Sequence, residues 1–460
     1  MTTHIAIIGG GASGTLLAAN IRRYAQDGHA LRVTIIDPAL ETARGLAYST
    51  RNPSHLLNVR ASQISGFADE PDHFLRWLAA RCGEAVAPDS FVPRDLYGQY
   101  LEELLADVMA PGQPVSVRIL HQECTGLRQM DSGVEILLAD GSFLPAHYTV
   151  IASGFGVRKQ VASPLRDAWS CDLPNDANAR VLVIGSGLSM VDKVLSLLDA
   201  GHQGPIHVVS RRGLMPQAHG AHHPLQLSTA DIPLGASVHY LTRWLRQLVR
   251  THQARGGDWR DVMDGLRPHN QAIWRHLSSD SRARFLRHAA AFWDVHRHRM
   301  PPAQSARIEE ALRTGQLTVA RGRFNGARAE GEKTIACIVD PSSGTHVRHQ
   351  VDIAYDCRGV RKTSGHLLAP FVESLIQRGQ GRLCPHGLGL EFDPAGALLS
   401  AEGVPSSRIF GIGPVTMARN WETIAIPDIR VQARRLAEQF QSRRAGHFAS
   451  VKDREARPER

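Results

Sequence analysis

Two glycine-rich turns of the same kind lie about 175 residues apart in this chain. The first follows the apolar run Ile5–Ile8 and reads Gly9-Gly10-Gly11-Ala12-Ser13-Gly14. The second follows Val181–Ile184 and reads Gly185-Ser186-Gly187-Leu188-Ser189-Met190. Each pattern predicts a buried strand that runs directly into the first turn of a helix. Bare backbone at such a turn lets a pyrophosphate approach the amide N–H groups at the positive end of the helix.

Two dinucleotide sites in one chain indicate a flavoprotein, in which electrons pass from one cofactor to the other. We therefore expect an α/β fold with two Rossmann-like dinucleotide-binding domains, as in glutathione-reductase-like flavoproteins, and a helical insertion. A chain of 460 residues is long enough for two or three domains. The expected first domain covers 1–162, the second covers 163–375 with the insertion at about 225–310, residues 376–442 return to the first, and 443–460 form a disordered tail.

Hydrophobic periodicity and turn residues predict the other elements. Strands are expected at 4–8, 31–36, 148–152, 181–184, 206–210, 317–321, 333–339 and 351–356. Helices are expected at 13–26, 71–82, 94–109, 188–200 and from about 427 to 441. Strands near 115–121 and 133–138, with the turn Asp140-Gly141, are expected to form a small antiparallel element. Residues 45–66 read as a loop, either folded against a ligand or plainly exposed, and 163–179 read as a linker.

The first turn is typical of an FAD site. The next strand ends in Asp37, 23 residues beyond Gly14, where a carboxylate can accept hydrogen bonds from both ribose hydroxyls of an adenosine. The alternative is an ordinary strand-end aspartate before Pro38. The candidate FAD contacts from this pattern are Gly9, Gly11, Ala12, Ser13, Gly14 and Asp37.

The second turn fits NADPH better than NADH, although NADH is also compatible with it. Met190 replaces the third glycine, and Ser210-Arg211-Arg212 stands where an acid would accept from a free ribose hydroxyl. A hydroxyl and two guanidinium groups match a 2′-phosphate instead. The alternatives are a helix cap without a ligand and two solvated loop charges. The candidate NAD(P) contacts are Gly185, Gly187, Leu188, Ser189, Arg211 and Arg212.

The formal net charge of +9 raises the question of nucleic acid. Arginine supplies 48 of the 53 basic side chains. They are scattered through the predicted helices rather than gathered with exposed aromatic residues, which argues against nucleic-acid binding.

Cysteines and histidines argue against several kinds of site. No two of the six cysteines form a CxxC or another close pair, so neither a zinc site nor a disulfide framework is indicated. The redox-active pair that disulfide reductases need near the flavin is also missing. His219, His222, His223, His296 and His298 lack carboxylate or thiolate neighbours at ligand spacing, so we expect no metal.

No leader precedes the first strand and no apolar run reaches about 18–20 residues, so we expect a cytoplasmic protein without a membrane partner.

Several longer segments carry a family resemblance. The chain resembles bacterial FAD/NAD(P)-binding proteins related to class B flavin monooxygenases and N-hydroxylases, including those called FAD-dependent urate hydroxylases. Met190 is typical of that group. The matching segments are Gly9–Gly14, Gly45–Tyr48, His55–Val59, Asp72–Leu78, Gly185–Asp192, Trp293–Arg299 and Trp421–Arg430.

This resemblance implies an enzyme in which NADPH reduces FAD and the flavin then activates dioxygen. One oxygen atom goes to a small polar or nitrogen-containing substrate, with urate as the specific candidate, or leaves as peroxide. The resemblance also implies that the last strand and helix return to the FAD domain, with the positive helix end at the flavin. It places Gly413, Ile426 and Asn58 at the FAD. No catalytic side chain and no oligomeric state follow from the sequence.

Two other functions remain open at this point. The chain could be a reductase or oxidase that uses the flavin without inserting oxygen into a substrate. It could instead be a flavin-binding sensory or structural protein with little turnover. Stoichiometric formation of an oxygenated product distinguishes the monooxygenase from both.

Overall fold

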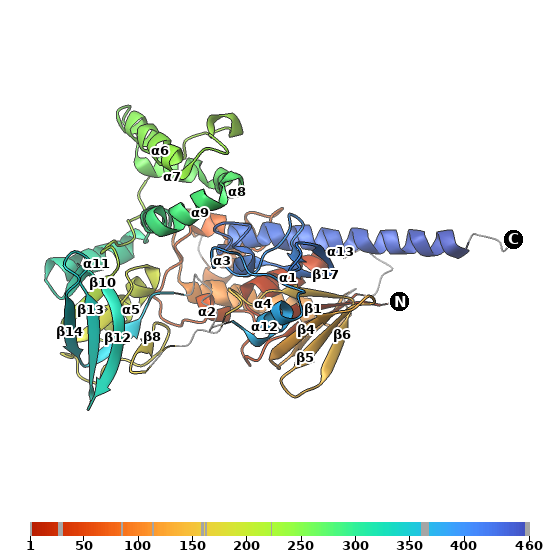
Figure 1. Cartoon of the computed structure of the whole chain (residues 1–460), viewed down its shortest axis with the longest axis horizontal. Coiled ribbons are helices and arrows are strands. Elements are labelled where there is room, and N and C mark those ends of the chain that lie inside the picture. Colours follow the sequence, from red (N-terminus) through yellow and green to blue (C-terminus); the bar gives the residue numbers. More distant parts are fainter. Residues whose placement is uncertain are drawn as a thin grey trace. The chain divides into compact units, whose positions relative to one another are not determined.

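The computed structural model describes residues 2–25, 31–83, 86–112, 115–157, 161, 163–221, 223–359 and 368–455 (Figure 1). The chain divides into two units. Unit 1 consists of Met1–Ser49, Val59–Arg158 and Arg361–Arg460, and unit 2 of Thr50–Asn58 and Lys159–Val360. The segment 50–58, which we expected in the first domain, therefore belongs with unit 2, and the second crossing lies at 360/361 rather than at 375/376.

Unit 1 is built on a six-stranded sheet in the order β16-β17-β7-β1-β2-β3. All neighbours are parallel except the edge pair β16–β17. The central strands β1 and β2 are mainly apolar and mostly buried, as expected for a parallel sheet covered on both faces. The strands are β1 (Thr3–Ile8), β2 (Leu31–Ile36), β3 (Val115–Leu120), β7 (Tyr148–Ile151), β16 (Ala397–Leu399) and β17 (Pro405–Gly411).

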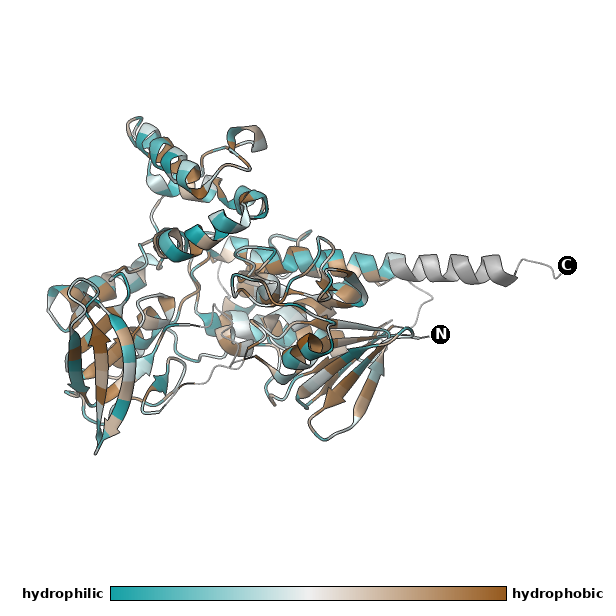
Figure 2. Ribbon diagram, in the orientation of Figure 1, coloured by the Kyte–Doolittle hydropathy of each residue, from teal (hydrophilic) through white to brown (hydrophobic). Residues whose placement is uncertain are grey.

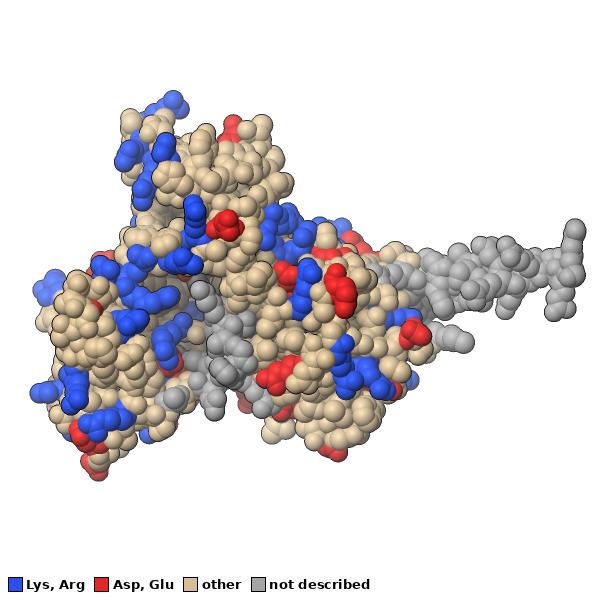
Figure 3. Space-filling model, in the orientation of Figure 1, with Lys and Arg blue, Asp and Glu red and all other residues tan. Residues whose placement is uncertain are grey.

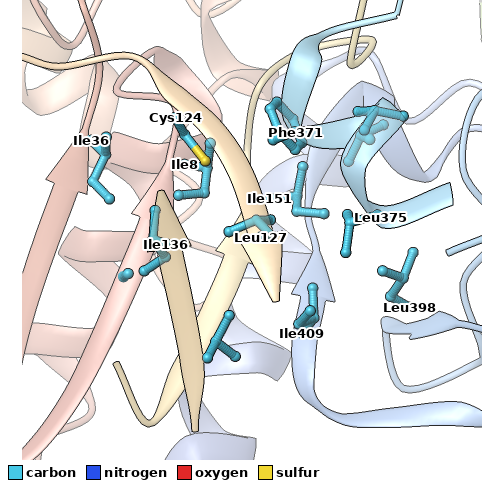
Figure 4. Packing of buried hydrophobic residues seen from close by; sticks show 14 of the residues in the cluster. Ile8, Ile36, Cys124, Leu127, Ile136, Ile151, Phe371, Leu375, Leu398 and Ile409 are labelled. Carbon is cyan, nitrogen blue, oxygen red and sulfur yellow. The ribbon is translucent and has the colours of Figure 1, made fainter. Parts of the chain in front are cut away.

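A three-stranded antiparallel sheet covers part of the large sheet. It consists of β4 (Cys124–Gln129), β5 (Val134–Leu138) and β6 (Phe143–Ala146). Our assignment of 115–121 to this element was wrong, because β3 pairs in parallel with β2 along its whole length, and β4, which we did not predict, takes its place. Figure 4 shows Ile8 and Ile151 of the large sheet, Leu127 and Ile136 of the small one, and Leu375 around a common core.

Helices complete unit 1. They are α1 (Ala12–Arg23), α2 (Gly45–Tyr48), α3 (His73–Cys82), α4 (Arg94–Met109), α12 (Pro370–Gln377) and α13 (Ile426–Glu455), with the 3₁₀ turns η1 (Ala61–Gln63) and η5 (Gly413–Thr416). Helix α1 packs against both α4 and α13. Helix α13 continues past 442, where we expected a disordered tail to begin. Low apolar content argues against burial but not against helix, because Arg, Ala, Lys and Glu have high helix propensity.

Unit 2 contains a second parallel sheet in the order β11-β10-β9-β15-β8. The segment 163–179, predicted as a linker, supplies the edge strand β8, which pairs with β15. The strands are β8 (Arg166–Asp167), β9 (Val181–Ile184), β10 (Ile206–Ser210), β11 (Leu317–Arg321) and β15 (Ile353–Asp356), and helix α5 (Leu188–Asp199) follows β9. A further antiparallel sheet consists of β12 (Arg323–Glu330), β13 (Lys333–Val339) and β14 (His346–Val351).

The predicted helical insertion is present between β10 and β11. It contains η2 (Thr229–Asp231), α6 (Val238–Gln253), α7 (Trp259–Gly265), η3 (Arg267–His269), α8 (Asn270–His276), α9 (Ser279–Arg284), the π-helix η4 (Phe285–Ala289), α10 (Ala290–Arg297) and α11 (Pro302–Arg313). Helix α6 carries both apolar and polar residues along its length (Figure 2). Its apolar side, including Trp244 and Leu248, packs on a small core formed by Ile232, Val262 and Leu266.

Within the described residues, no helix combines the length and the apolar composition that a membrane span requires.

Replacing Met190 with alanine should destabilise unit 2, because this side chain is fully buried among Val181, Val183 and Ile206. We expect a loss of about 2–5 kcal/mol in the free energy of unfolding from the lost contacts and the remaining cavity. Urea denaturation followed by tryptophan fluorescence measures this loss. Val404→Ala, at a position 62% exposed, is the control and should change the free energy by less than about 0.5 kcal/mol. Equal changes in the two variants would contradict the packing described for Met190.

Candidate functional site

The two glycine turns have the same backbone geometry. The φ angle is +106° at Gly9 and +105° at Gly185, a region that residues with a side chain rarely adopt. A Cβ at Gly9 would lie 2.7 Å from the carbonyl oxygen of Ala152, and one at Gly185 would lie 2.6 Å from that of Cys357. Each turn therefore closes directly onto the end of a neighbouring parallel strand, β7 in unit 1 and β15 in unit 2.

Both helices that follow the turns begin without a capping side chain. Gly11 is the N-cap of α1 and Gly187 that of α5, and among the described residues no side chain caps either helix. Neither first turn contains an acidic residue. By contrast, side chains cap three helices of the insertion, namely Ser237 at α6, Asp258 at α7 and Ser278 at α9. The helices α3, α4 and α12 of unit 1 also lack a side-chain cap, so what sets α1 and α5 apart is a glycine N-cap after a parallel strand, a geometry that can bind a phosphate.

The turns differ at their sixth position. A Cβ at Gly14 would overlap with the carbonyl oxygen of Gly9, so the start of α1 tolerates no side chain there. The corresponding Met190 is fully buried in the core of unit 2. The second turn therefore keeps the geometry of the first without the third glycine.

Asp37 lies beside the first turn. Its Oδ2 accepts a hydrogen bond from the Gly10 amide at 2.6 Å, and its Oδ1 accepts one from the Ala39 amide at 2.9 Å. Because each carboxylate oxygen can accept more than one hydrogen bond, these contacts leave capacity for a further donor. The structure thus brings Asp37 to the turn and also gives it a local role, fixing the end of β2 to Gly10.

The C-terminal part of the chain returns to the first turn, as expected. A Cβ at Gly413 would overlap with Oγ of Ser13 in the first turn of α1. The Gly413 amide donates a hydrogen bond to Oε1 of Gln432 on α13 at 2.8 Å. Ile426, the first residue of α13, is 1% exposed. Ser13, Gly413 and the start of α13 therefore form one neighbourhood in unit 1.

Asn58 belongs to unit 2, whereas the other predicted FAD contacts belong to unit 1. It ends the segment 50–58 of unit 2, and its carbonyl oxygen is 3.1 Å from Nε2 of His219. The same segment is bound to α5, because Nε2 of His55 lies 2.9 Å from the carbonyl oxygen of Asp192, and Asn52 donates to Asp199 at 2.9 Å. Sequence reasoning missed these contacts, since none of them joins residues close in the chain.

Arg211 and Arg212 are exposed at the end of β10, beside the second turn. The Arg212 guanidinium lies 5.2 Å from the centre of the Phe292 ring, and its Nη2 donates to the carbonyl oxygen of Arg287 at 3.4 Å. Arg287 belongs to the π-helix η4, a conformation that is frequent at functional sites. The insertion thus helps to orient Arg212. Ser210 has a hydrogen-bond partner in the second turn, since the Ser186 hydroxyl donates to Oγ of Ser210 at 2.8 Å.

The excess of basic over acidic residues lies entirely in unit 2. Its residues 50–58 and 159–360 include 27 lysines and arginines against 18 acids, whereas unit 1 has 26 of each. Figure 3 shows basic side chains over the part of unit 2 where Figure 1 labels α6 and α9. A positive field of this kind raises the local concentration of anionic ligands.

The histidines considered as metal ligands have structural partners. Nδ1 of His296 lies 2.7 Å from the carbonyl oxygen of Phe292, and His298 lies 3.9 Å from Asp294. Across the described ranges, no group of three or more His, Cys, Asp or Glu side chains could hold a metal ion, and His222 lies outside them. The six cysteines are all free thiols.

Comparison with known proteins supports the fold assignment. Residues 6–156, which include the first turn, match a family model described as FAD-NAD(P)-binding. No curated protein sequence matches the chain significantly. Among solved structures, the ornithine N-hydroxylase of Kutzneria sp. 744 has a TM-score of 0.64 at 14% identity, covering 96% of this chain and 100% of that one.

Two further solved structures share the fold. The L-lysine 6-monooxygenase of Pseudomonas syringae has a TM-score of 0.62 at 16% identity, covering 95% of this chain and 99% of that one. The bacillithiol disulfide reductase of Staphylococcus aureus has a TM-score of 0.55 at 12% identity, with coverages of 96% and 99%. The chain therefore has the two-dinucleotide flavoprotein fold of the ornithine and lysine hydroxylases, and its residues 6–156 match the FAD-NAD(P)-binding family.

Proposed function

We propose that this protein is an FAD-dependent, NAD(P)H-consuming monooxygenase of a small polar or nitrogen-containing substrate. The observation that carries the proposal is the pair of uncapped glycine turns with φ angles of +106° and +105°, one on each parallel sheet. When bound, the flavin takes hydride from the nicotinamide and passes electrons to dioxygen. The fold likeness to hydroxylases of ornithine and lysine supports the oxygenase class.

In unit 1, the residues around the first turn would hold FAD. Gly9, Gly11 and Gly14 would leave the backbone bare for the pyrophosphate, and the amides of Ala12 and Ser13, in the first turn of α1, would donate to it. Asp37 would accept from the adenosine ribose. At the flavin end, Gly413 and Ile426 would place the positive end of α13 beside the ring, where it stabilises the anionic reduced form. Asn58 remains a proposed contact from the segment 50–58.

In unit 2, the second turn would hold the nicotinamide coenzyme. Gly185 and Gly187, with the amides of Leu188 and Ser189, would bind its pyrophosphate at the start of α5. Arg211 and Arg212 would bind the 2′-phosphate, which favours NADPH over NADH because charge-assisted hydrogen bonds to phosphate are strong. The excess positive charge of unit 2 supports this assignment.

The substrate is proposed at the level of its class. The structural neighbours named for their substrates act on ornithine and lysine, so a primary amine is a better first candidate than urate, which no comparison supports. We assign no catalytic side chain, because the oxygen chemistry belongs to the cofactor. Dioxygen and the small molecule are the expected reaction partners.

A second candidate is a reductase that inserts no oxygen, since the disulfide reductase of Staphylococcus aureus shares the fold. The cysteine positions disfavour a disulfide reductase, because Cys124, Cys357 and Cys384 are buried and no two of the six are close in sequence.

The monooxygenase should consume NADPH and dioxygen together and form an oxygenated product. Anaerobic stopped-flow mixing with NADPH should reduce the flavin in a single turnover, and a pulse of oxygen should reoxidise it. A panel of ornithine, lysine and related amines, analysed by mass spectrometry, should yield a product heavier by one oxygen atom. Reduction of the added substrate under nitrogen would indicate a reductase instead. Reduction too slow to support turnover at saturating NADPH would indicate a sensory protein.

Gly187→Val should block NADPH and leave FAD in place. A Cβ at Gly187 meets no described atom within 4 Å, and its φ of −85° and ψ of −168° suit valine, so the variant should fold. The side chain would occupy the space of the pyrophosphate, and we expect the dissociation constant of NADPH to rise at least about tenfold. Calorimetric titration measures this constant. Unchanged NADPH affinity would show that the second turn does not bind the coenzyme.

The matched change in unit 1 is Gly11→Val. A Cβ there would lie 3.2 Å from Cα of Gly45, on the backbone where FAD is proposed to bind. The purified variant should lack the visible absorbance of bound flavin while NADPH still binds. Retention of FAD in this variant would contradict the assignment of the first turn.

The double variant Arg211→Ala with Arg212→Ala should raise the KM of NADPH by at least about 100-fold, since two charge-assisted contacts are lost and each costs about 1.5–3 kcal/mol. The KM of NADH should stay within about twofold, because NADH lacks the 2′-phosphate. Phe292→Ala should act in the same direction but less, by releasing Arg212 from its orientation. Arg246→Ala, an exposed residue of α6, is the control. Equal effects on both coenzymes would contradict the 2′-phosphate assignment.

A further inference from the structure

Arg44 is an almost fully buried cation, with 2% of its side chain exposed. Its Nε donates to Oε1 of Glu102 at 2.5 Å and its Nη2 to Oε2 of the same carboxylate at 2.8 Å. Its Nη1 donates to Oδ1 of Asp95 at 2.7 Å and to the carbonyl oxygen of Tyr48 at 3.2 Å. Nη1 also donates to the carbonyl oxygen of Asp95 at 3.4 Å, so one side chain binds two acids and two backbone carbonyls, with the bidentate geometry that arginine favours at Glu102.

Helix α4 is shaped to receive this side chain. Asp95, Gly98 and Glu102 are spaced three and four residues apart, so they share one face of the helix. A Cβ at Gly98 would overlap with Nη1 of Arg44 and would lie 2.7 Å from the carbonyl oxygen of Tyr48. Burial by itself lowers the pKa of Arg44, but its hydrogen bonds to Glu102 and Asp95 raise it overall, so the group stays charged.

The backbone on both sides of Arg44 meets the first glycine turn. Ala43 has a φ of +83°, which is unusual for a residue with a side chain, and its amide donates to the carbonyl oxygen of Gly10 at 2.7 Å. On the other side, a Cβ at Gly45 would lie 3.1 Å from Cα of Gly11. The segment 43–45 is therefore held in a strained conformation directly against the start of α1. Such strain persists only where surrounding contacts enforce it.

We propose that Arg44 is a positioning residue for FAD. By fixing Ala43–Gly45 to α4, it builds one wall of the pyrophosphate site on the first glycine turn before the cofactor binds. The inference rests on the proposed function, in that it takes the first turn to be the FAD site. Arg44 acts through the backbone of Gly45 and Gly11 and needs no contact of its own with the cofactor.

Stability gained from ion pairing does not by itself explain why Arg44 is buried. Burying an ion pair brings little net stability, because desolvation offsets the attraction between the charges. Arg81 of α3 and Glu103 of α4 form an exposed ion pair at 2.7 Å, which joins the two helices without the desolvation cost of burial. Arg44 is buried and its two acids are partly exposed, and what the three groups hold in place is Ala43, a positive-φ residue next to the bare backbone of Gly11.

The test measures FAD binding to apoprotein prepared by removing the flavin. Arg44→Met should raise the FAD dissociation constant at least about tenfold, because the segment 43–45 loses its anchor. Arg44→Lys should restore only part of the affinity, since lysine cannot form the bidentate contact. The control Arg81→Met should stay within about twofold of the wild type. Titration of flavin fluorescence and the visible circular dichroism of bound FAD report the effect.

A second variant distinguishes a specific loss of FAD binding from misfolding of the protein. Arg44→Met leaves two acids without their cation, so the triple variant with Asp95→Asn and Glu102→Gln removes all three charges together. Its thermal unfolding temperature without FAD should lie near that of the wild-type apoprotein, while its FAD affinity remains reduced at least about tenfold. The NADPH dissociation constant should be unchanged in every variant, because that site belongs to unit 2.

The outcomes separate the two proposals. Wild-type protein that takes up no FAD would overturn the proposed function. Wild-type protein that binds FAD, together with a folded triple variant that binds it equally well, would overturn the role of Arg44 alone. A triple variant that fails to fold even with added FAD would also overturn it, since the role would then be one of general stability.

Discussion

The closure of each glycine turn onto the end of a neighbouring strand is the contact on which the rest of the site depends. Carbonyl oxygens of Ala152 and Cys357 lie where a side chain at Gly9 or Gly185 would have to be. This closeness holds the start of the following helix at the edge of a parallel sheet, where its first N–H groups are proposed to bind a phosphate. The six-stranded and the five-stranded parallel sheets both have this arrangement, with different helices and different cores.

Beyond the turns, the two units differ in charge and in the residue that follows the second strand. Unit 1 is electrically balanced and places Asp37 against Gly10, which suits a ribose with free hydroxyl groups. Unit 2 carries the whole net charge and places Arg211 and Arg212 at the equivalent position. In the proposed function, one backbone geometry binds both dinucleotides, and the side chains after the second strand of each sheet distinguish them.

Much of the fold could be predicted because it depends on local patterns. The apolar runs 5–8 and 181–184, the glycine turns and the helix 94–109 follow from period and turn chemistry alone. The pairing of strands that lie far apart in the sequence was harder to predict. Strand β3 looked like half of a hairpin, but it joins β2 in parallel, and the segment 163–179 contributes an edge strand. Neither partner is close in sequence, and a short strand carries no mark of which neighbour it will pair with.

The sequence by itself determined where the two dinucleotide turns lie, which strands precede them and which charges follow them, because a turn needs only adjacent residues. The tertiary structure alone decided that Gly413 meets Ser13, that residues 50–58 bind to α5, and that Arg44 reaches Asp95 and Glu102 across Gly98. These contacts join residues tens or hundreds of positions apart. Their side chains become neighbours only after the sheets have formed and the helices have packed on them.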